Sequence, residues 1–172
     1  MRGRRAWAPP RPAGARPRTG RVHGVDETAF RQAFTSTISR PCPFEKSVLT
    51  RCAACSQAAR HYIAEREVVA CVSGPAHRRC VELRVLLREN FLFALHRSHI
   101  DGPLPHAQEM RMQCGGLRGL RFALDGGAHP DVGDGVDDVA GLLARALQRY
   151  GGLADLPFAL MVRRAMSERR RR

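Results

Sequence analysis

Five of the six cysteines have a side chain and a spacing that suit the binding of a metal or a cluster. They fall close together in the chain, at Cys42, Cys52, Cys55, Cys71 and Cys80, in the spacing C-x9-C-x2-C-x15-C-x8-C. Thiolate sulfur is the ligand that zinc and iron–sulfur clusters take from proteins. In a reducing compartment, scattered cysteines have little reason to gather in this way. The clustering therefore predicts that these sulfurs meet around one inorganic centre.

The predicted helices near these cysteines favour an anionic centre. Cys52 and Cys55 stand three residues apart at the start of a helix predicted over residues 53–66, so both sulfurs can face one point. Cys80 lies near the second turn of a helix predicted over residues 75–97. A helix N-terminus carries about half a positive charge, which stabilises thiolates. We therefore expect two helix N-termini to converge on the centre.

Cys42 adds a signal of its own, because a Cys-Pro pair such as Cys42-Pro43 is frequent at iron–sulfur ligands.

We favour a [4Fe–4S]-type cluster held by four of the five cysteines. The spacing leaves open which four, with Cys42 and Cys52 as the candidates for the spare position. The sixth cysteine, Cys114, is expected to be a core residue. Such a protein would act in electron transfer, redox sensing or assembly of a redox enzyme, with a redox protein as partner.

Three other uses of the cysteines stay open. A structural zinc would make the chain a protein-interaction module, but zinc modules usually have two short knuckles, and only Cys52 and Cys55 have that spacing. A thiol oxidoreductase would use Cys52 and Cys55 as its dithiol. That motif normally follows a strand in a βαβ unit, and residues 46–50 make a poor strand. The cysteines could also be buried simply as small apolar residues.

No other motif competes with the cysteines for a catalytic role. The chain contains no G-x-x-x-x-G-K-[ST] phosphate loop, no dinucleotide fingerprint and no G-x-S-x-G nucleophile motif. No pair of carboxylates stands at a convincing catalytic spacing. We therefore expect no independent catalytic activity.

The elements that must position the cysteines are mostly helical. Apolar residues at helical spacing predict helices within residues 26–39, over 53–66, 75–97 and 136–150, and in a last short segment that opens at Pro157. Residues 68–72 are predicted to be extended, and alternation around Gly115-Gly116 predicts a β-hairpin over 110–124. The fold class is therefore α+β, mostly α: a small single domain with a cysteine-rich metal-binding lobe and a β-hairpin.

The net charge of +13 is concentrated at the two ends of the chain. Residues 1–21 contribute +7 and residues 163–172 contribute +5, so the segment between them carries only +1. This pattern predicts a disordered Arg/Pro-rich tail over 1–24, one cysteine-rich domain over 25–162 and a basic tail over 163–172. A nearly neutral body with few aromatic residues disfavours nucleic-acid binding.

Two further features concern the cellular setting. No apolar run approaches the ~18–20 residues that cross a bilayer, and no export signal is present, so we expect a cytoplasmic protein without a membrane span. Arg outnumbers Lys by 28 to one, which is typical of a GC-rich, bacterial-type genome. The sequence leaves the oligomeric state open.

Overall fold

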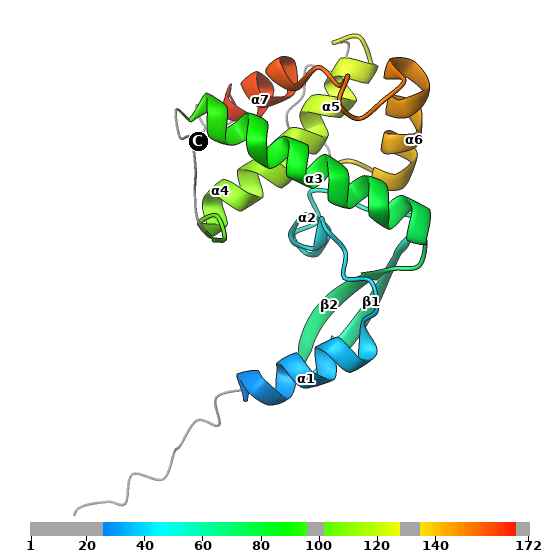
Figure 1. Cartoon of the computed structure of the whole chain (residues 1–172), viewed down its shortest axis with the longest axis vertical. Coiled ribbons are helices and arrows are strands. Elements are labelled where there is room, and N and C mark those ends of the chain that lie inside the picture. The colour runs from blue at the N-terminus through cyan, green and yellow to red at the C-terminus, as the bar shows by residue number, and fades with distance from the viewer. Residues whose placement is uncertain (1–25, 96–101, 128–134, 168–172) are drawn as a thin grey trace, which may run out of the picture.

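The computed structural model describes residues 26–95, 102–127 and 135–167. In these parts the chain is mostly helical, with one two-stranded antiparallel hairpin, which agrees with an α+β class (Figure 1). The elements, in chain order, are α1 (Glu27–Thr37), α2 (Glu45–Leu49), β1 (Ala58–Ile63), β2 (Arg66–Cys71), α3 (Gly74–Ala94), α4 (His106–Met110), the π-helical turn η1 (Arg111–Gly115), α5 (Gly116–Leu124), α6 (Val139–Tyr150) and α7 (Phe158–Ser167). None of the described helices has the length and apolar character that a bilayer crossing requires.

The long helix α3 begins and packs as the sequence predicts. Ser73 caps it, because its hydroxyl accepts a hydrogen bond from the Ala76 N–H at 3.2 Å, and a proline lies in the first turn. The buried stripe consists of Cys80, Leu83, Leu87 and Phe91. Val81 and Val85 lie outside this stripe and are 43% and 51% exposed.

The helix predicted over residues 53–66 is replaced by a loop and strand β1. β1 pairs with β2 from Ala58↔Cys71 to Ile63↔Arg66, through a turn in which Ala64 and Glu65 have φ values of 47° and 66°. The apolar positions at helical spacing were mostly Ala and Cys, which gain little from burial. Strand pairing instead provides hydrogen-bond partners for the backbone of residues 68–72, the segment predicted to be extended, and it buries Val68 and Val69.

The β-hairpin predicted over residues 110–124 is also wrong. α4, η1 and α5 run continuously through this segment, and Gly115 and Gly116 have helical φ values of −67° and −62°. A Cβ on Gly115 would lie 2.5 Å from the Ala165 Cβ, and one on Gly116 would lie 2.8 Å from Leu87 Cδ2. Because these glycines have no side chain, α7 can pack closely against Gly115 and α3 against Gly116. They form no turn.

The two predicted tails have different outcomes. Residues 1–24 lie outside the described residues. Helix α7, however, continues through Arg163 and Arg164 to Ser167, into the segment predicted to be a basic tail. The reason is that Ala165 on this last part of the helix is fully buried against the core.

Most of the core lies between α3, α5, α6 and α7. A second, smaller cluster consists of Ile38, Ile63 and Val68, with Phe30 and Phe34 of α1 packed against it. Figure 1 shows α1 on the outer side of the β1–β2 hairpin, away from the helical body. The hairpin therefore connects the smaller cluster to the helical body, because its second strand leads directly into α3.

Candidate metal centre

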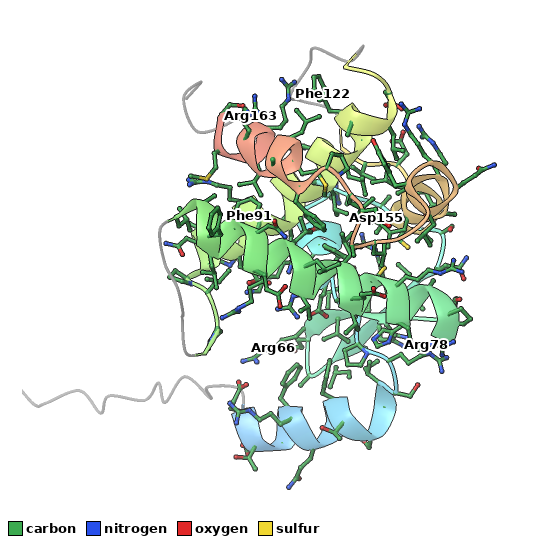
Figure 2. The ribbon with its side chains drawn as sticks, turned by 45° about the horizontal axis from the view of Figure 1, so that its top comes forward. Arg66, Arg78, Phe91, Phe122, Asp155 and Arg163 are labelled. Carbon is green, nitrogen blue, oxygen red and sulfur yellow. A yellow bond between two sulfur atoms is a disulfide. The ribbon has the colours of Figure 1, made fainter. Side chains whose placement is uncertain are left out.

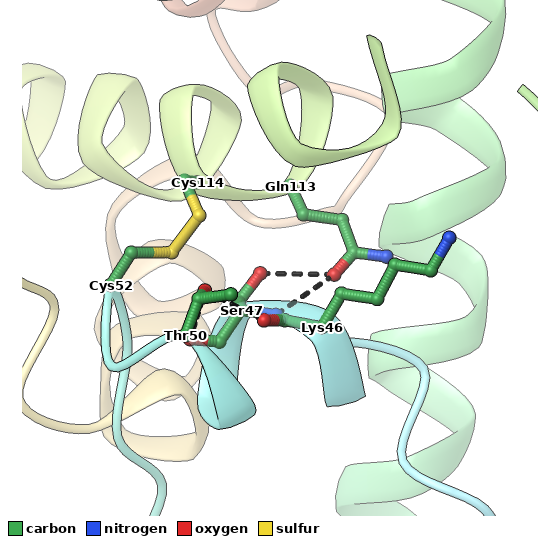
Figure 3. The surroundings of a disulfide bond; sticks show 6 residues. All are labelled: Lys46, Ser47, Thr50, Cys52, Gln113 and Cys114. Atoms are coloured by element: carbon green, nitrogen blue, oxygen red, sulfur yellow. Dashed lines mark hydrogen bonds between the residues drawn. A yellow bond between two sulfur atoms is a disulfide. The ribbon is translucent and has the colours of Figure 1, made fainter. Parts of the chain in front are cut away.

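The structure divides the six cysteines into one disulfide and four free thiols. Cys52 is bonded to Cys114 of η1, with 5.9 Å between their Cα atoms (Figure 3). The free thiols are those of Cys42, Cys55, Cys71 and Cys80. Of the five ligands predicted from the sequence, Cys52 is thus separated from the others. Cys114 is buried, as expected, but its bond to Cys52 was not foreseen.

The four free cysteines line a single small cavity. Its remaining wall is almost wholly apolar and includes Pro43, Phe44, Val48, Ala58, Ala76 and Val139. The cavity measures about 10 Å³, which is on the scale of one water molecule. Tertiary folding therefore brings together four thiols that come from four different segments of the fold.

Backbone pairing along β2 positions two of these cysteines. The Cys42 N–H donates to the Val69 carbonyl at 2.8 Å, and the Cys71 N–H donates to the Arg40 carbonyl at 2.8 Å. The segment before α2 therefore lies alongside the last residues of β2. Cys71 ends that strand, and α3 then carries Cys80 into the cavity from its second turn.

Cys55 is positioned by the start of α6. The Ala54 N–H donates to the Val136 carbonyl at 2.7 Å, and the Asp138 carboxylate accepts from the Ser56 N–H at 2.9 Å. Asp138 is also the N-cap of α6. The prediction that two helix N-termini converge on the cysteines therefore needs a correction, because the second helix is α6 and the segment 53–66 forms none.

Burial sets the protonation of the cavity thiols. It raises the pKa of Cys42 to about 11 and that of Cys80 to about 12, and it also raises the pKa of Cys55. Backbone N–H groups oppose this effect, including that of Gln57, which lies 3.4 Å from the Cys55 sulfur. These three residues are neutral thiols near pH 7 unless a cation is bound. A bound metal supplies the positive charge that makes a coordinating thiol ionise.

The spacing of the sulfurs also constrains what could bind. Among the described residues, no group of three or more His, Cys, Asp or Glu side chains has the arrangement that holds one metal ion. A tetrahedral zinc site needs every sulfur about 2.3 Å from one common point. In a cluster each cysteine binds a different iron atom, so its sulfurs stand farther apart. Either occupant requires the thiols to open or to rearrange around it.

A buried polar network fixes the wall of the cavity from behind. Ser47 of α2 donates from its N–H and its hydroxyl to Gln113 Oε1, at 3.3 Å and 3.0 Å (Figure 3). Gln113 Nε2 donates to Glu109 at 2.8 Å, and Glu109 accepts from Arg84 of α3 at 2.9 Å. This network, together with the disulfide, holds α2 against η1, and α2 contributes Val48 to the cavity.

The sequence signal for the centre was the clustering of cysteines, and it identified all four free thiols. It did not separate Cys52 from them, because its disulfide partner is 62 residues away and no local pattern links the two. The structure also does not place Cys52 with Cys55 as a dithiol. No protein-family model, curated protein or solved structure matches this chain.

Proposed function

We propose that this protein binds a [4Fe–4S]-type cluster through Cys42, Cys55, Cys71 and Cys80. Its role is then electron transfer, redox sensing or assembly of a redox enzyme, with a redox protein as partner. One observation carries the proposal, namely that four free thiols from four separate segments line one apolar cavity. Four cysteines are the usual ligand set of such a cluster.

Two details favour a cluster over zinc. With Cys52 in a disulfide, the shortest spacing left among the free cysteines is the C-x8-C of Cys71 and Cys80, so no short zinc knuckle remains. Cys42 keeps its following proline, as cluster ligands often do. The backbone N–H near Cys55 and the apolar wall are also features by which proteins adjust the potential of a cluster.

Zinc is the second candidate, and the size of the cavity supports it. A volume of about 10 Å³ is closer to the size of one ion than to that of a cluster, so zinc would need the smaller rearrangement of the thiols. Zinc bound by four cysteines would be structural, and the protein would then be an interaction module. The arrangement supports a thiol oxidoreductase less well, because a reactive cysteine needs a lowered pKa and that of Cys55 is raised.

Metal analysis of protein purified without oxygen tests the proposal. Iron and acid-labile sulfide in equal amounts, with broad absorbance near ~400 nm that a reductant bleaches, would support the cluster. One zinc per chain without colour would replace the cluster by the zinc module. A metal-free chain would refute both candidates.

Cysteine variants locate the site. Cys55→Ser and Cys71→Ser should each lose the bound metal, because each removes one of four ligands. The matched control is the double variant Cys52→Ser/Cys114→Ser, which also removes two cysteines, but two that do not line the cavity. Full loading in the ligand variants, or loss of metal in the control, would contradict the assignment.

The proposed setting is the cytoplasm of a bacterial-type cell. Disulfides are rare in that compartment, so the state of Cys52 and Cys114 there is informative. Alkylation of lysates followed by mass spectrometry measures it. A Cys52–Cys114 bond that persists in every growth condition would favour an oxidising compartment over the cytoplasm.

A further inference from the structure

The Cys52–Cys114 disulfide ties the chain segment that carries Cys55 to the helical body. This segment, the 50–57 linker, joins α2 to β1 and lies outside the helices and strands. Cys114 is only 8% exposed and belongs to η1, which packs against α3 and α7 within the helical body (Figure 2). Cys55 follows Cys52 by three residues, and three residues span at most about 11 Å. The bond therefore limits how far the Cys55 backbone moves from η1.

The 50–57 linker is the part of the cavity wall that can yield. Backbone hydrogen bonds to β2 and its neighbouring segment hold Cys42 and Cys71, and Cys80 belongs to the buried stripe of α3. Among the four cavity cysteines, Cys55 is the one that comes from the linker. The cavity of about 10 Å³ holds no cluster as it stands. An occupant therefore makes its room mainly by displacing the linker.

The backbone of the linker is strained next to the disulfide. Arg51 has a φ value of 60°, in the left-handed region that residues with a side chain rarely adopt. Such a conformation persists only where the surroundings hold it. The neighbouring Cys52 is held by its bond to Cys114 and by the Val136 N–H, which donates to the Cys52 carbonyl at 3.0 Å. Breaking the disulfide removes the covalent restraint and lets Arg51 relax.

Thiol–disulfide exchange reaches the bond from the Cys52 side, because Cys52 is partly exposed and Cys114 is buried. A thiolate of a cellular dithiol attacks the Cys52 sulfur, forms a mixed disulfide and releases Cys114, which takes up a proton. The second thiol of the dithiol then displaces Cys52. Two electrons and two protons pass to the chain, and the dithiol becomes a disulfide. In the proposed cytoplasmic setting, disulfides are usually transient and serve catalysis or redox sensing.

We propose that Cys52 and Cys114 form a redox switch that controls metal loading of the cavity. The disulfide holds the linker in place and the cavity closed, and reduction by a dithiol lets the linker move so that the four thiols hold their occupant more tightly. The inference rests on the proposed function, because it needs a metal or a cluster in the cavity. A purely structural disulfide would have the opposite effect, because it would stabilise the folded site to which metal binding is coupled.

The test measures the midpoint potential of the disulfide in the loaded and in the metal-free protein. The full chain is purified without oxygen, one half is stripped with a chelator, and both halves are equilibrated in buffers of reduced and oxidised dithiothreitol. Alkylation and mass spectrometry report Cys52 and Cys114 separately from the four cavity cysteines. Circular dichroism checks that the stripped chain keeps its helices.

Loading should raise the midpoint potential by about 30 mV. The cost of one left-handed residue such as Arg51 corresponds to about a tenfold change in an equilibrium constant, so we expect the reduced form to bind its occupant about tenfold more tightly. Affinity and potential are linked reciprocally, and a tenfold change in a two-electron couple is about 30 mV.

Two variants separate the switch from the site. Cys52→Ser/Cys114→Ser removes the disulfide, so in dialysis against increasing EDTA it should lose half of its metal at about tenfold more EDTA than the disulfide form, as should the reduced wild type. The matched control is Cys71→Ser, which keeps the disulfide but lacks a cavity thiol. Its disulfide potential should be the same with and without the metal that the wild type binds.

Metal content separates the two possible failures. A chain that binds no metal refutes the proposed function, and this inference with it. A loaded chain whose disulfide potential equals that of the metal-free chain, or lies below it, refutes the inference alone. A shift that persists in Cys71→Ser would also overturn it, because the coupling would then bypass the cavity. Where chelation unfolds the chain, the EDTA comparison decides, and equal or weaker retention in Cys52→Ser/Cys114→Ser contradicts the switch.

Discussion

Replacing Gln113 by Met should destabilise the protein far more than replacing Gln108 by Met. The two glutamines lie five residues apart on the continuous helical segment of α4 and η1. Gln113 is 2% exposed and joins Ser47 to Glu109 through three hydrogen bonds. The side-chain oxygen of Gln108 is also buried, but within the described residues it has no hydrogen-bond partner.

The magnitude follows from the groups that each substitution leaves behind. Gln113→Met removes the acceptor of the Ser47 N–H and hydroxyl, and an unsatisfied buried polar group costs about 1–3 kcal/mol. It also removes one donor to the Glu109 carboxylate, worth about 1.5–3 kcal/mol. After the gain from burying a thioether, we expect a net loss of about 3 kcal/mol, or about 9 °C in Tm.

Gln108→Met removes a buried oxygen that has no hydrogen-bond partner among the described residues, so its desolvation cost disappears. We expect stability to stay within about 0.5 kcal/mol or to rise by up to about 1 kcal/mol. Both side chains are good helix formers, so helix propensity does not separate the two variants.

Urea unfolding followed by circular dichroism measures both effects. The metal-free and the loaded protein are compared separately, because a bound group adds stability of its own. Equal m-values show that the change lies in stability and not in the compactness of either state. Equal losses in the two variants, or a larger loss for Gln108→Met, would refute the hydrogen-bond reasoning.

Three further predictions concern packing, the disulfide and pH. Gly119→Ala should cost about 2–3 kcal/mol in thermal unfolding, since its Cβ would lie 2.7 Å from the α7 backbone, whereas Gly74→Ala, with its nearest atom 3.7 Å away, should be nearly neutral. Reduction of the disulfide, which closes a separation of 62 residues, should lower stability by about 4 kcal/mol by urea titration, and an unchanged midpoint would contradict this. Asp138→Ala should cost about 2 kcal/mol at pH 7 through the lost N-cap and the lost Ser56 bonds. Burial raises the pKa of Asp138, but hydrogen bonds from Ser56 and the α6 N-terminus outweigh it and lower the pKa below 3.8. Asp138 therefore stabilises the fold fully above pH 3.8, and this stabilisation is lost as the pH falls through its lowered pKa. The free energies of unfolding of the wild type and Asp138→Ala should converge in acid, and a constant difference between them would contradict the shift.

The sequence alone determined the elements whose signals are long and local. The buried stripe of α3, its start at Ser73 or Gly74 and the helix that ends at Gly151 follow from periodicity and capping, which act within a few residues. Residues 53–66 and 110–124 were assigned wrongly because short apolar patterns are ambiguous. Only the packing partner, such as α7 against Gly115, showed that a glycine there serves close contact and not a turn.

The same division holds for the candidate site. Clustering along the chain predicted that Cys42, Cys52, Cys55, Cys71 and Cys80 meet, because gathering five of the six cysteines into one short stretch is improbable by chance. The tertiary structure alone paired Cys52 with Cys114 and left the other four around one cavity. The physical reason is that spacing along a chain limits how far apart two sulfurs can lie, but only the packing of helices and strands decides which of them meet.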